Sequence, residues 1–330
     1  MGTKIHWGIV GTGSIARQFA KALGVLKDAE LTAVSSRRQE TADKFGEEFS
    51  TPHRHVGVEG LASDRDVDVV YIATPHPMHV KDTLACLDGG KAVLCEKPFA
   101  MNASEAGKMV ERAREKGLFL MEAMWTHFFP AMAKVREIVA SGAIGEVRLV
   151  EADFCFRCGW NPEGRLLNPE LGGGALLDVG VYNVALAQMI YGRKPARISS
   201  MAHLGETGVD EQSSAILGYE DGAMAVLTCA IRTTTPNEAA VYGTDGFIKI
   251  PAMFCQPDRI VVKRGTEREE EMNFKRLRNG YTYEAMEVMQ CLRNGVLESR
   301  IVPLAMSMEI METMDEIRRQ WGLVYPIETT

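Results

Sequence analysis

The hydrophobic pattern of the first 120 residues alternates between short apolar runs and amphipathic stretches. The apolar runs have the length of buried strands, and they end at glycine, proline or polar clusters. We expect strands at residues 4–10, 31–35, 69–73, 92–95 and 118–122. The stretches between them predict helices at residues 14–26, 40–49, 79–89 and 104–116. This alternation predicts a parallel, doubly wound sheet whose ligand crevice lies at the carboxyl ends of the strands.

Beyond residue 124 the pattern changes to alternating apolar and polar residues, which is typical of half-buried antiparallel strands. We expect strands at residues 147–156, 197–204, 213–219, 223–230, 239–242, 246–250 and 259–263. We expect helices at residues 131–141, 175–191 and 304–321. The second part of the chain is therefore predicted to be an α+β domain with a large, mainly antiparallel open sheet.

A glycine motif, Gly11-Thr12-Gly13-Ser14-Ile15-Ala16, joins the first predicted strand to the first helix. The first glycine permits a tight turn, the second lets the backbone approach a pyrophosphate, and the small third residue lets helix and strand pack closely. The positive end of the helix dipole favours the phosphates. The motif predicts a dinucleotide site that includes Gly11, Gly13, Ser14 and Ile15, with a plain tight turn as the alternative.

The chain is long enough, at 330 residues, for two domains. Its fold class is predicted to be α/β. We expect a Rossmann dinucleotide-binding domain over residues 1–123 and a substrate-binding and dimerisation domain over residues 124–330.

The end of the second predicted strand indicates which dinucleotide is bound. The strand ends at Ser36, Arg37 and Arg38, where an NAD enzyme usually carries an acid that holds the ribose 2′-hydroxyl. Serine and arginine suit a 2′-phosphate instead, and arginine also stacks on adenine. We therefore expect NADP rather than NAD. The alternative is that the two arginines are only a solvated loop end.

Composition excludes several classes of partner. The chain has 37 basic and 44 acidic residues, a net charge of −7, and no basic block, which argues against nucleic acid. We expect no signal peptide and no apolar run of membrane-spanning length. Seven scattered cysteines fit reduced thiols in a cytoplasm. The lone pair Cys155 and Cys158 lacks the second pair of a zinc site, so no metal is expected.

Two later strand ends carry candidate chemistry. The strand at residues 69–73 runs into Thr74, Pro75 and His76, where the backbone should pass the nicotinamide ribose, with His79 at the start of the next helix. The strand at residues 92–95 is followed by Glu96-Lys97-Pro98, which places an amine at the predicted crevice. A cis Lys97–Pro98 bond would turn the lysine into that crevice within one residue.

The order of these motifs, followed by the run from Gly172 to Tyr182, resembles the glucose–fructose oxidoreductase/inositol dehydrogenase (Gfo/Idh/MocA) family over essentially the whole chain. Residues 121–130 resemble the dimeric dihydrodiol dehydrogenase branch, which also contains NADP-linked D-xylose dehydrogenases. Members of that branch usually carry arginine where this chain has His127.

The resemblance implies a two-domain, NADP-dependent oxidoreductase that acts on a sugar, polyol or cyclic diol held between the domains. It implies a homodimer or higher homo-oligomer formed through the open sheet. By residue match, it implies the catalytic set Lys97, Asp178 and Tyr182.

These three residue types suit alcohol oxidation, in which the protein handles a proton while the cofactor takes a hydride. A tyrosine phenol is a good acid/base when a cation lowers its pKa, so we favour Tyr182 over Lys97 for the proton transfer. Asp178 and Tyr182 are spaced i, i+4 on one predicted helix. Out of context, each of the three has an ordinary structural explanation.

Five further residues are candidates for the substrate pocket. Aromatic residues could floor its apolar part or belong to the core, and polar loop residues could meet substrate hydroxyls or be solvated. They are Trp125, His127, Phe128, Arg165 and Asn168. Two other functions stay open: a non-catalytic NADP-binding regulatory protein, and an enzyme that retains its cofactor and couples two substrates.

Overall fold

The computed structural model describes residues 4–328, which form two compact units. The first unit comprises the chain up to Trp125 together with Leu277–Ser307, and the second comprises Thr126–Arg276 together with the chain from Met308. The first unit thus takes up a segment that the predicted division places entirely in the second domain. The assignment of cofactor and substrate binding to the two parts stays a prediction.

The first unit is built on a six-stranded parallel sheet, which confirms the predicted fold class. Its order is β3-β2-β1-β4-β5-β6. Successive strands are added towards one edge from β1 to β3 and towards the other edge from β4 to β6, so the strand order reverses between β1 and β4. The strands are β1 (Ile5–Val10), β2 (Ala29–Ser36), β3 (His53–Val56), β4 (Val69–Ile72), β5 (Ala92–Glu96) and β6 (Leu120–Ala123). Ligands of such sheets bind at this switch point, outside the carboxyl ends of the strands.

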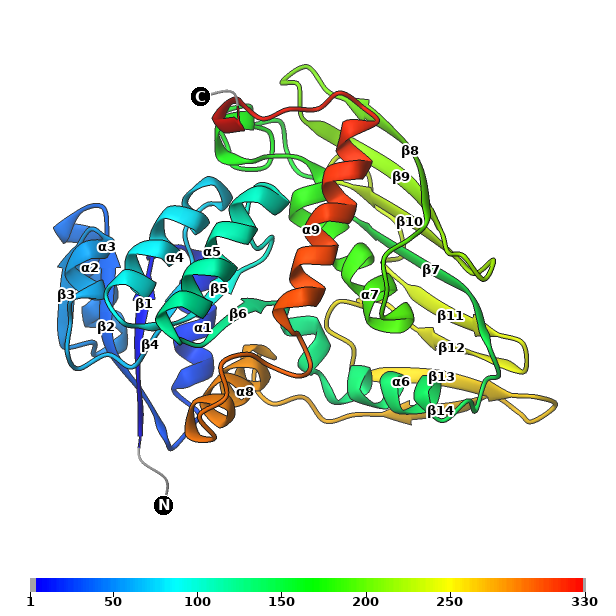
Figure 1. The fold of residues 1–330 in the computed structure, drawn as a ribbon, viewed down its shortest axis with the longest axis horizontal. Coiled ribbons are helices and arrows are strands. Elements are labelled where there is room, and N and C mark those ends of the chain that lie inside the picture. Colours follow the sequence, from blue (N-terminus) through cyan, green and yellow to red (C-terminus); the bar gives the residue numbers. More distant parts are fainter. Residues whose placement is uncertain (1–3, 329–330) are drawn as a thin grey trace. The chain divides into compact units, whose positions relative to one another are not determined.

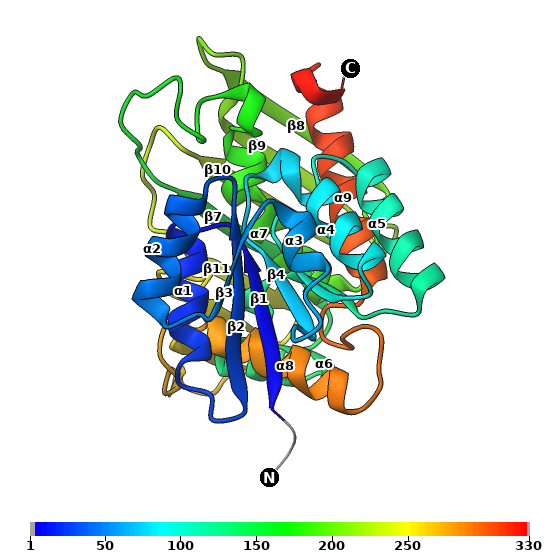
Figure 2. The same ribbon diagram turned by 90° about the vertical axis from the view of Figure 1, so that its left-hand side faces the viewer.

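Helices cover both faces of this sheet (Figures 1 and 2). One face carries α1 (Ser14–Leu23) and α2 (Gln39–Phe49). The other carries α3 (Val58–Ala62), α4 (His79–Asp88) and α5 (Ala103–Lys116). Beneath α1, the ring of Phe19 stacks on that of Tyr71 with centroids 3.8 Å apart, which forms an aromatic core on that face.

A further helix of the first unit, α8 (Tyr281–Arg293), comes from far along the chain and packs against α1. Asn279, just before it, donates a hydrogen bond of 2.8 Å to the backbone carbonyl of Gln18. The ring of Tyr281 lies parallel to that of Trp125 with centroids 4.3 Å apart. The sequence pattern did not predict this helix.

The second unit contains an eight-stranded sheet of order β14-β13-β12-β11-β7-β10-β9-β8. All neighbours are antiparallel except β7 and β10. The strands are β7 (Val147–Cys155), β8 (Arg197–Leu204), β9 (Asp210–Gly218), β10 (Met224–Ala230), β11 (Ala239–Gly243), β12 (Gly246–Ile250), β13 (Arg259–Arg264) and β14 (Glu270–Asn273). The predicted mainly antiparallel sheet is confirmed, and only β14 was missed.

One face of this second sheet is covered by α6 (Pro130–Ala140), α7 (Val181–Tyr191) and most of α9 (Leu304–Arg319) (Figure 1). The stretch Pro169–Tyr191 is long and apolar enough to cross a membrane, but 94% of its most apolar window is buried, as in the core helix of a globular unit. On the opposite face, alternate side chains of β8, β9 and β10 are exposed; the large apolar ones include Met201, Ile216, Met224 and Val226.

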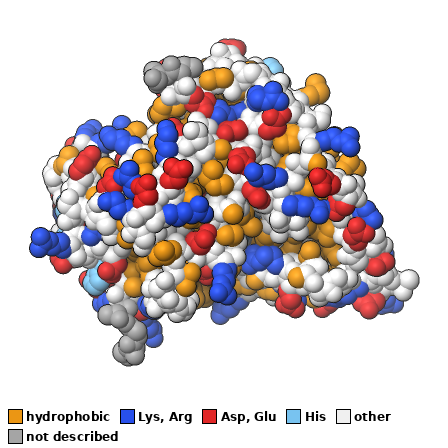
Figure 3. All heavy atoms as spheres, in the orientation of Figure 1, with side chains coloured by type: hydrophobic (Ala, Val, Ile, Leu, Met, Phe, Trp, Pro, Cys, Tyr) orange, Lys and Arg blue, Asp and Glu red, His pale blue; other side chains and the backbone are white. Residues whose placement is uncertain are grey.

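The charged surface is mixed in sign. Figure 3 shows lysine and arginine side chains interspersed with aspartate and glutamate over the visible face. That face offers no extended basic surface to a polyanion.

Candidate functional site

The glycine loop of the first unit has the geometry that a bound diphosphate requires. Gly11 has φ +106°, and a Cβ there would lie 2.7 Å from the carbonyl oxygen of Ala73, so only glycine fits. A Cβ on Gly13 would meet no heavy atom within 4 Å, so the backbone there is accessible to a ligand. No side chain caps the N-terminus of α1 among the described residues. The loop and the exposed helix end therefore fit phosphate groups.

The end of β2 places the Ser36 hydroxyl beside this loop, and Arg37 is the next residue of the chain. The Ser36 hydroxyl lies 2.6 Å from that of Thr41 and 3.5 Å from that of Thr12 in the glycine loop. Arg37 is exposed and makes no hydrogen bond or ion pair with any residue between 4 and 328. A guanidinium with no protein partner at this strand end is available for a phosphate.

His79 ties the end of β4 to the turn after β5. Its Nδ1 lies 2.8 Å from the carbonyl oxygen of Pro98, and its Nε2 lies 3.0 Å from that of Thr74. Burial lowers the pKa of His79 to about 4, so the ring is neutral at pH 7 and donates to only one of these carbonyls. The Lys97–Pro98 bond is cis, as predicted. His79 itself is fully buried, so the structure shows it linking the two loops, and its contact with cofactor stays a prediction.

Behind Lys97, three buried carboxyl groups surround the end of β5. Glu96 accepts a hydrogen bond from the hydroxyl of Tyr71, and its Oε2 lies 3.2 Å from the backbone nitrogen of Lys97. Burial raises the pKa of Glu122 to about 7 and that of Glu284 well above its ordinary value, and the charge of Glu96 adds to both shifts. Three such groups do not all ionise together, so the cluster holds protons at neutral pH. Sequence reasoning found only Glu96.

This cluster predicts an inverse pH dependence of stability. A folded-state pKa of about 7 for Glu122, against 4.5 when unfolded, gives stability that is complete below pH 4.5 and is lost as the pH rises through 7. Glu122→Gln should therefore be more stable than wild type at pH 8 by about 3 kcal/mol, with little difference at pH 4.5. Urea unfolding at both pH values measures this. The control Glu111→Gln changes an exposed glutamate and should leave the stability unchanged at both pH values. An equal effect of Glu122→Gln at both pH values would contradict the prediction.

In the second unit, Asp178 and Tyr182 lie close together in the chain on neighbouring helical segments. Asp178 is in a π-helical turn, η4 (Leu176–Gly180), and Tyr182 is in the first turn of α7. Both are nearly buried, at 6% and 7% exposure. Arg165 donates a hydrogen bond of 2.6 Å to Asp178 Oδ1, and the Tyr182 ring packs on Phe154 with centroids 5.4 Å apart. The predicted helix is present, but its first turn is wider than an α-helix, as is frequent at functional sites.

The π-helical turn is anchored by residues that the sequence did not single out. Asp210 Oδ2 accepts the backbone N–H of Leu176 at 2.7 Å. The Tyr325 hydroxyl donates to the carbonyl of Gly173 at 2.7 Å. Gly174 has φ +121°, and a Cβ there would lie 2.1 Å from Asp210 Oδ1. The Gly172-Gly173-Gly174 run was the signal in the sequence, because three successive glycines mark a backbone that passes close to its neighbours.

The remaining pocket candidates have structural partners. Trp125 stacks on Tyr281 within the first unit. In the second unit, Phe128 is 9% exposed, and Asn168 Oδ1 caps the short helix Pro169–Leu171 by accepting the N–H of Glu170 at 2.9 Å. His127 is 1% exposed, and burial lowers its pKa to about 3, so it is neutral. Contact of these residues with a substrate stays a prediction.

Comparison with known families matches both parts of the chain. Residues 5–124 match the model of the oxidoreductase family with an NAD-binding Rossmann fold. Residues 132–249 match the GFO/IDH/MocA C-terminal domain.

Individual relatives match over nearly the full length. The chain is 41% identical over 334 residues to trans-1,2-dihydrobenzene-1,2-diol dehydrogenase of Mus musculus, covering 98% of each. It is 40% identical over 336 residues to the enzyme of the same name from Xenopus tropicalis, covering 99% of this chain and 100% of that one. Among solved structures, KijD10, a 3-ketoreductase from Actinomadura kijaniata in complex with NADP and TDP-benzene, is 27% identical with a TM-score of 0.85, covering 96% and 98% of the two chains. The chain therefore belongs to the GFO/IDH/MocA family of NAD(P)-dependent oxidoreductases, on the branch of the dihydrodiol dehydrogenases.

Proposed function

We propose that the protein is an NADP-dependent dehydrogenase or reductase that interconverts a hydroxyl and a carbonyl on a sugar, polyol or cyclic diol. The observation that carries this proposal is the combination of a phosphate-fitting glycine loop with Lys97, Asp178 and Tyr182 in a chain of this family. The diol and sugar classes are supported by the names of the relatives, which are diol dehydrogenases and a 3-ketoreductase.

The choice of NADP is supported by the end of β2. It presents the Ser36 hydroxyl and the Arg37 guanidinium and carries no acid that would hold a ribose 2′-hydroxyl. In addition, the KijD10 structure contains NADP.

We expect Arg37→Ala to weaken NADP binding selectively. Loss of a charge-assisted hydrogen bond to the 2′-phosphate costs about 1.5–3 kcal/mol, which is roughly a 10- to 150-fold rise in Kd. NAD has no 2′-phosphate, so its Kd should hardly change. Fluorescence or calorimetric titration of both nucleotides measures this, with the exposed Arg114→Ala on α5 as the control. Equal or tighter binding of NAD by the wild type would refute NADP dependence.

In the proposed chemistry, the bound nicotinamide supplies or accepts the hydride. The Tyr182 hydroxyl gives or takes the proton of the substrate oxygen, and the Lys97 ammonium favours the ionised phenol or acts on that oxygen directly. Asp178, held by Arg165, accepts a hydrogen bond from a substrate hydroxyl. KijD10 has been crystallised with a lysine replaced by alanine and with a tyrosine replaced by phenylalanine, the same two residue types.

The substrate class is tested by a steady-state screen that follows the absorbance of reduced nicotinamide. Trans-dihydrodiols, aldoses and inositols should be compared as alcohols, and ketosugars as carbonyls. Turnover of none of them, with NADP bound, would favour the second function, a non-catalytic regulatory protein. That function leaves Lys97, Asp178 and Tyr182 without a purpose. Retention of NADP through dialysis would favour an enzyme that couples two substrates without releasing its cofactor.

We also propose a homodimer that forms through the open face of the second sheet. Met201 is 81% exposed on the edge strand β8 and Ile216 is 49% exposed on its neighbour β9, and such apolar patches mark interfaces. The double variant Met201→Asp/Ile216→Asp should be monomeric in light scattering coupled to size exclusion, whereas wild type should be dimeric. The control is Met286→Asp, which changes a methionine on α8 that is 44% exposed. A monomeric wild type would overturn this proposal.

A cytoplasmic location is proposed on the cysteines. None of the seven forms a disulfide within the described residues, which suits a reducing compartment.

A further inference from the structure

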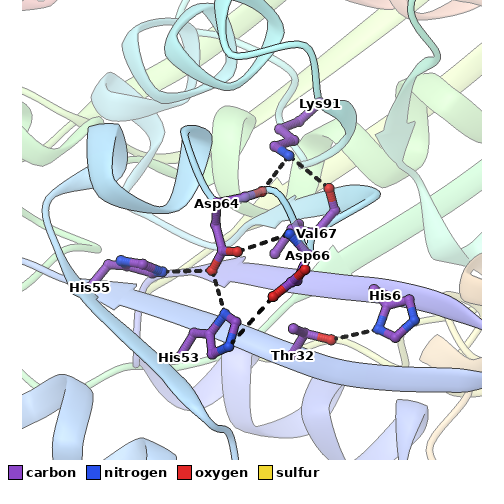
Figure 4. Close-up of polar contacts among 8 residues, drawn as sticks. All are labelled: His6, Thr32, His53, His55, Asp64, Asp66, Val67 and Lys91. Atoms are coloured by element: carbon purple, nitrogen blue, oxygen red, sulfur yellow. Dashed lines mark hydrogen bonds and ion pairs between the residues drawn. The ribbon is translucent and has the colours of Figure 1, made fainter.

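Two imidazoles and a carboxylate converge at the edge of the first unit's sheet (Figure 4). His53 and His55 stand two residues apart on the edge strand β3, so both side chains project from the same face. Asp64 follows helix α3. His53 Nδ1 lies 2.7 Å and His55 Nε2 lies 2.9 Å from one atom, Asp64 Oδ2. These three ligand atoms all lie within 4.8 Å of one another.

We propose that His53, His55 and Asp64 form a zinc site. Two imidazole nitrogens and one carboxylate oxygen are the ligand types that zinc accepts, whereas calcium and magnesium prefer oxygen alone. With metal–ligand bonds of about 2.0–2.2 Å, tetrahedral ligands stand about 3.3 Å apart. The observed ligand pairs need to open by only about half an ångström to admit the ion. The fourth position is left for water.

The carboxylate is held in place by its own loop. Asp64 Oδ1 accepts the backbone N–H of Asp66 at 3.0 Å, which leaves Oδ2 for the ion. Lys91 Nζ donates to the backbone carbonyls of Asp64 and Val67 at 2.5 and 2.8 Å, and so fixes the turn. The Asp64 side chain is only 7% exposed. A ligand fixed in this way loses little conformational entropy on binding.

The histidines have the surroundings of metal ligands. An Asp66 carboxylate oxygen lies 3.9 Å from His53 Nε2, the ring nitrogen that faces away from Asp64. Such carboxylates accept the second N–H of a metal-bound imidazole and orient it. A Cβ on Gly60 would come within 3.2 Å of His55 Nδ1, so glycine makes room for this ring. The two histidine side chains are 35% and 25% exposed, so an ion can enter.

Without metal, the same atoms form a hydrogen-bonded network in which Asp64 Oδ2 accepts from both rings. Zinc binding requires each ring to present a lone pair to the ion, and the proton of His53 then resides on Nε2, beside Asp66. The bound ion would clip the edge strand β3 to the segment after α3. The expectation of no metal was based on the lone pair Cys155 and Cys158, and the proposed site contains no cysteine.

The test uses untagged full-length protein, stripped of metal with a chelator and then titrated with ZnCl₂ by calorimetry. Cobalt(II) is a second probe, because its visible absorption reports four-coordinate geometry. We expect one ion per chain and a higher Tm in zinc than in chelator. His55→Gln and Asp64→Asn should abolish stoichiometric binding, and Asp66→Asn should weaken it about tenfold.

The control is His6→Gln, which removes a histidine of the same sheet whose Nδ1 lies 3.0 Å from the Thr32 hydroxyl, outside the cluster (Figure 4). It should bind zinc as the wild type does. Circular dichroism of each variant confirms that the fold is kept. The proposal is overturned if wild type binds no stoichiometric zinc, or if binding survives in His55→Gln and Asp64→Asn.

Discussion

Tyr182→Phe and Lys97→Met should each lower kcat by roughly 10²–10⁴, the usual contribution of positioned acid–base catalysis. If the phenol carries the proton and the ammonium lowers its pKa, the two residues act as one unit, so the double variant should be little worse than either single variant. Tyr182→Phe keeps the ring that packs on Phe154, so this packing should be retained. Its affinity for NADP should also be close to that of wild type.

Steady-state kinetics on the best substrate of the screen measures these effects. The kcat–pH profile of wild type should show an ionisation that disappears in Tyr182→Phe. The controls are Tyr242→Phe on β11 and Lys108→Met on α5, which remove the same groups elsewhere in the chain. If Tyr182→Phe keeps near-normal kcat while Lys97→Met is inactive, Lys97 is the acid/base. Activity in both variants would refute the catalytic set.

Gly174→Ala should cost roughly 3–5 kcal/mol of stability, because strain and overpacking add at this position. Its φ of +121° is unfavourable for any residue with a Cβ. The added carbon would lie 2.1 Å from Asp210 Oδ1 and 3.1 Å from the Tyr325 hydroxyl, and both groups anchor the chain on either side of this glycine. The turn that carries Asp178 must then move, so kcat should fall even in the folded fraction.

Chemical unfolding of Gly174→Ala measures the stability loss. The matched control is Gly192→Ala at the end of α7, where φ is +62° and a Cβ would meet no heavy atom within 4 Å. It should cost only about 1 kcal/mol. Equal losses of stability in the two variants would show that Asp210 moves aside at no cost in free energy and that its contact with the turn is unimportant.

Local chemistry explains which features could be predicted from the sequence. The glycine loop, five of the six parallel strands and the cis Lys97–Pro98 bond each depend on a few consecutive residues, and these were expected. The edge strand β3 was missed. Helix α8 at residues 281–293 was not expected, because its burial against α1 depends on residues more than 250 positions away.

The difference between local motifs and contacts made only by the fold applies to the site residues as well. Glu96 was found because it adjoins Lys97, whereas Glu284 joins the same cluster from α8 and has no local motif. Asp210 is the first residue of β9 and belongs to no local motif, and only the fold brings its carboxylate to the N–H of Leu176. His53 and Asp64 are eleven residues apart with a short helix between them, so their spacing matches no familiar metal motif.

The late return of the chain to the first unit determines the order in which the protein can be completed during synthesis. Residues 277–307 leave the ribosome only after Thr126–Arg276, so the first unit lacks α8 until nearly the whole second unit has been made. Until α8 is made, the nascent first unit leaves α1 uncovered on the side that α8 will occupy. Chaperones bind exposed apolar surface of this kind. A gene fragment that ends near residue 123 would encode this unfinished intermediate rather than an independent nucleotide-binding domain.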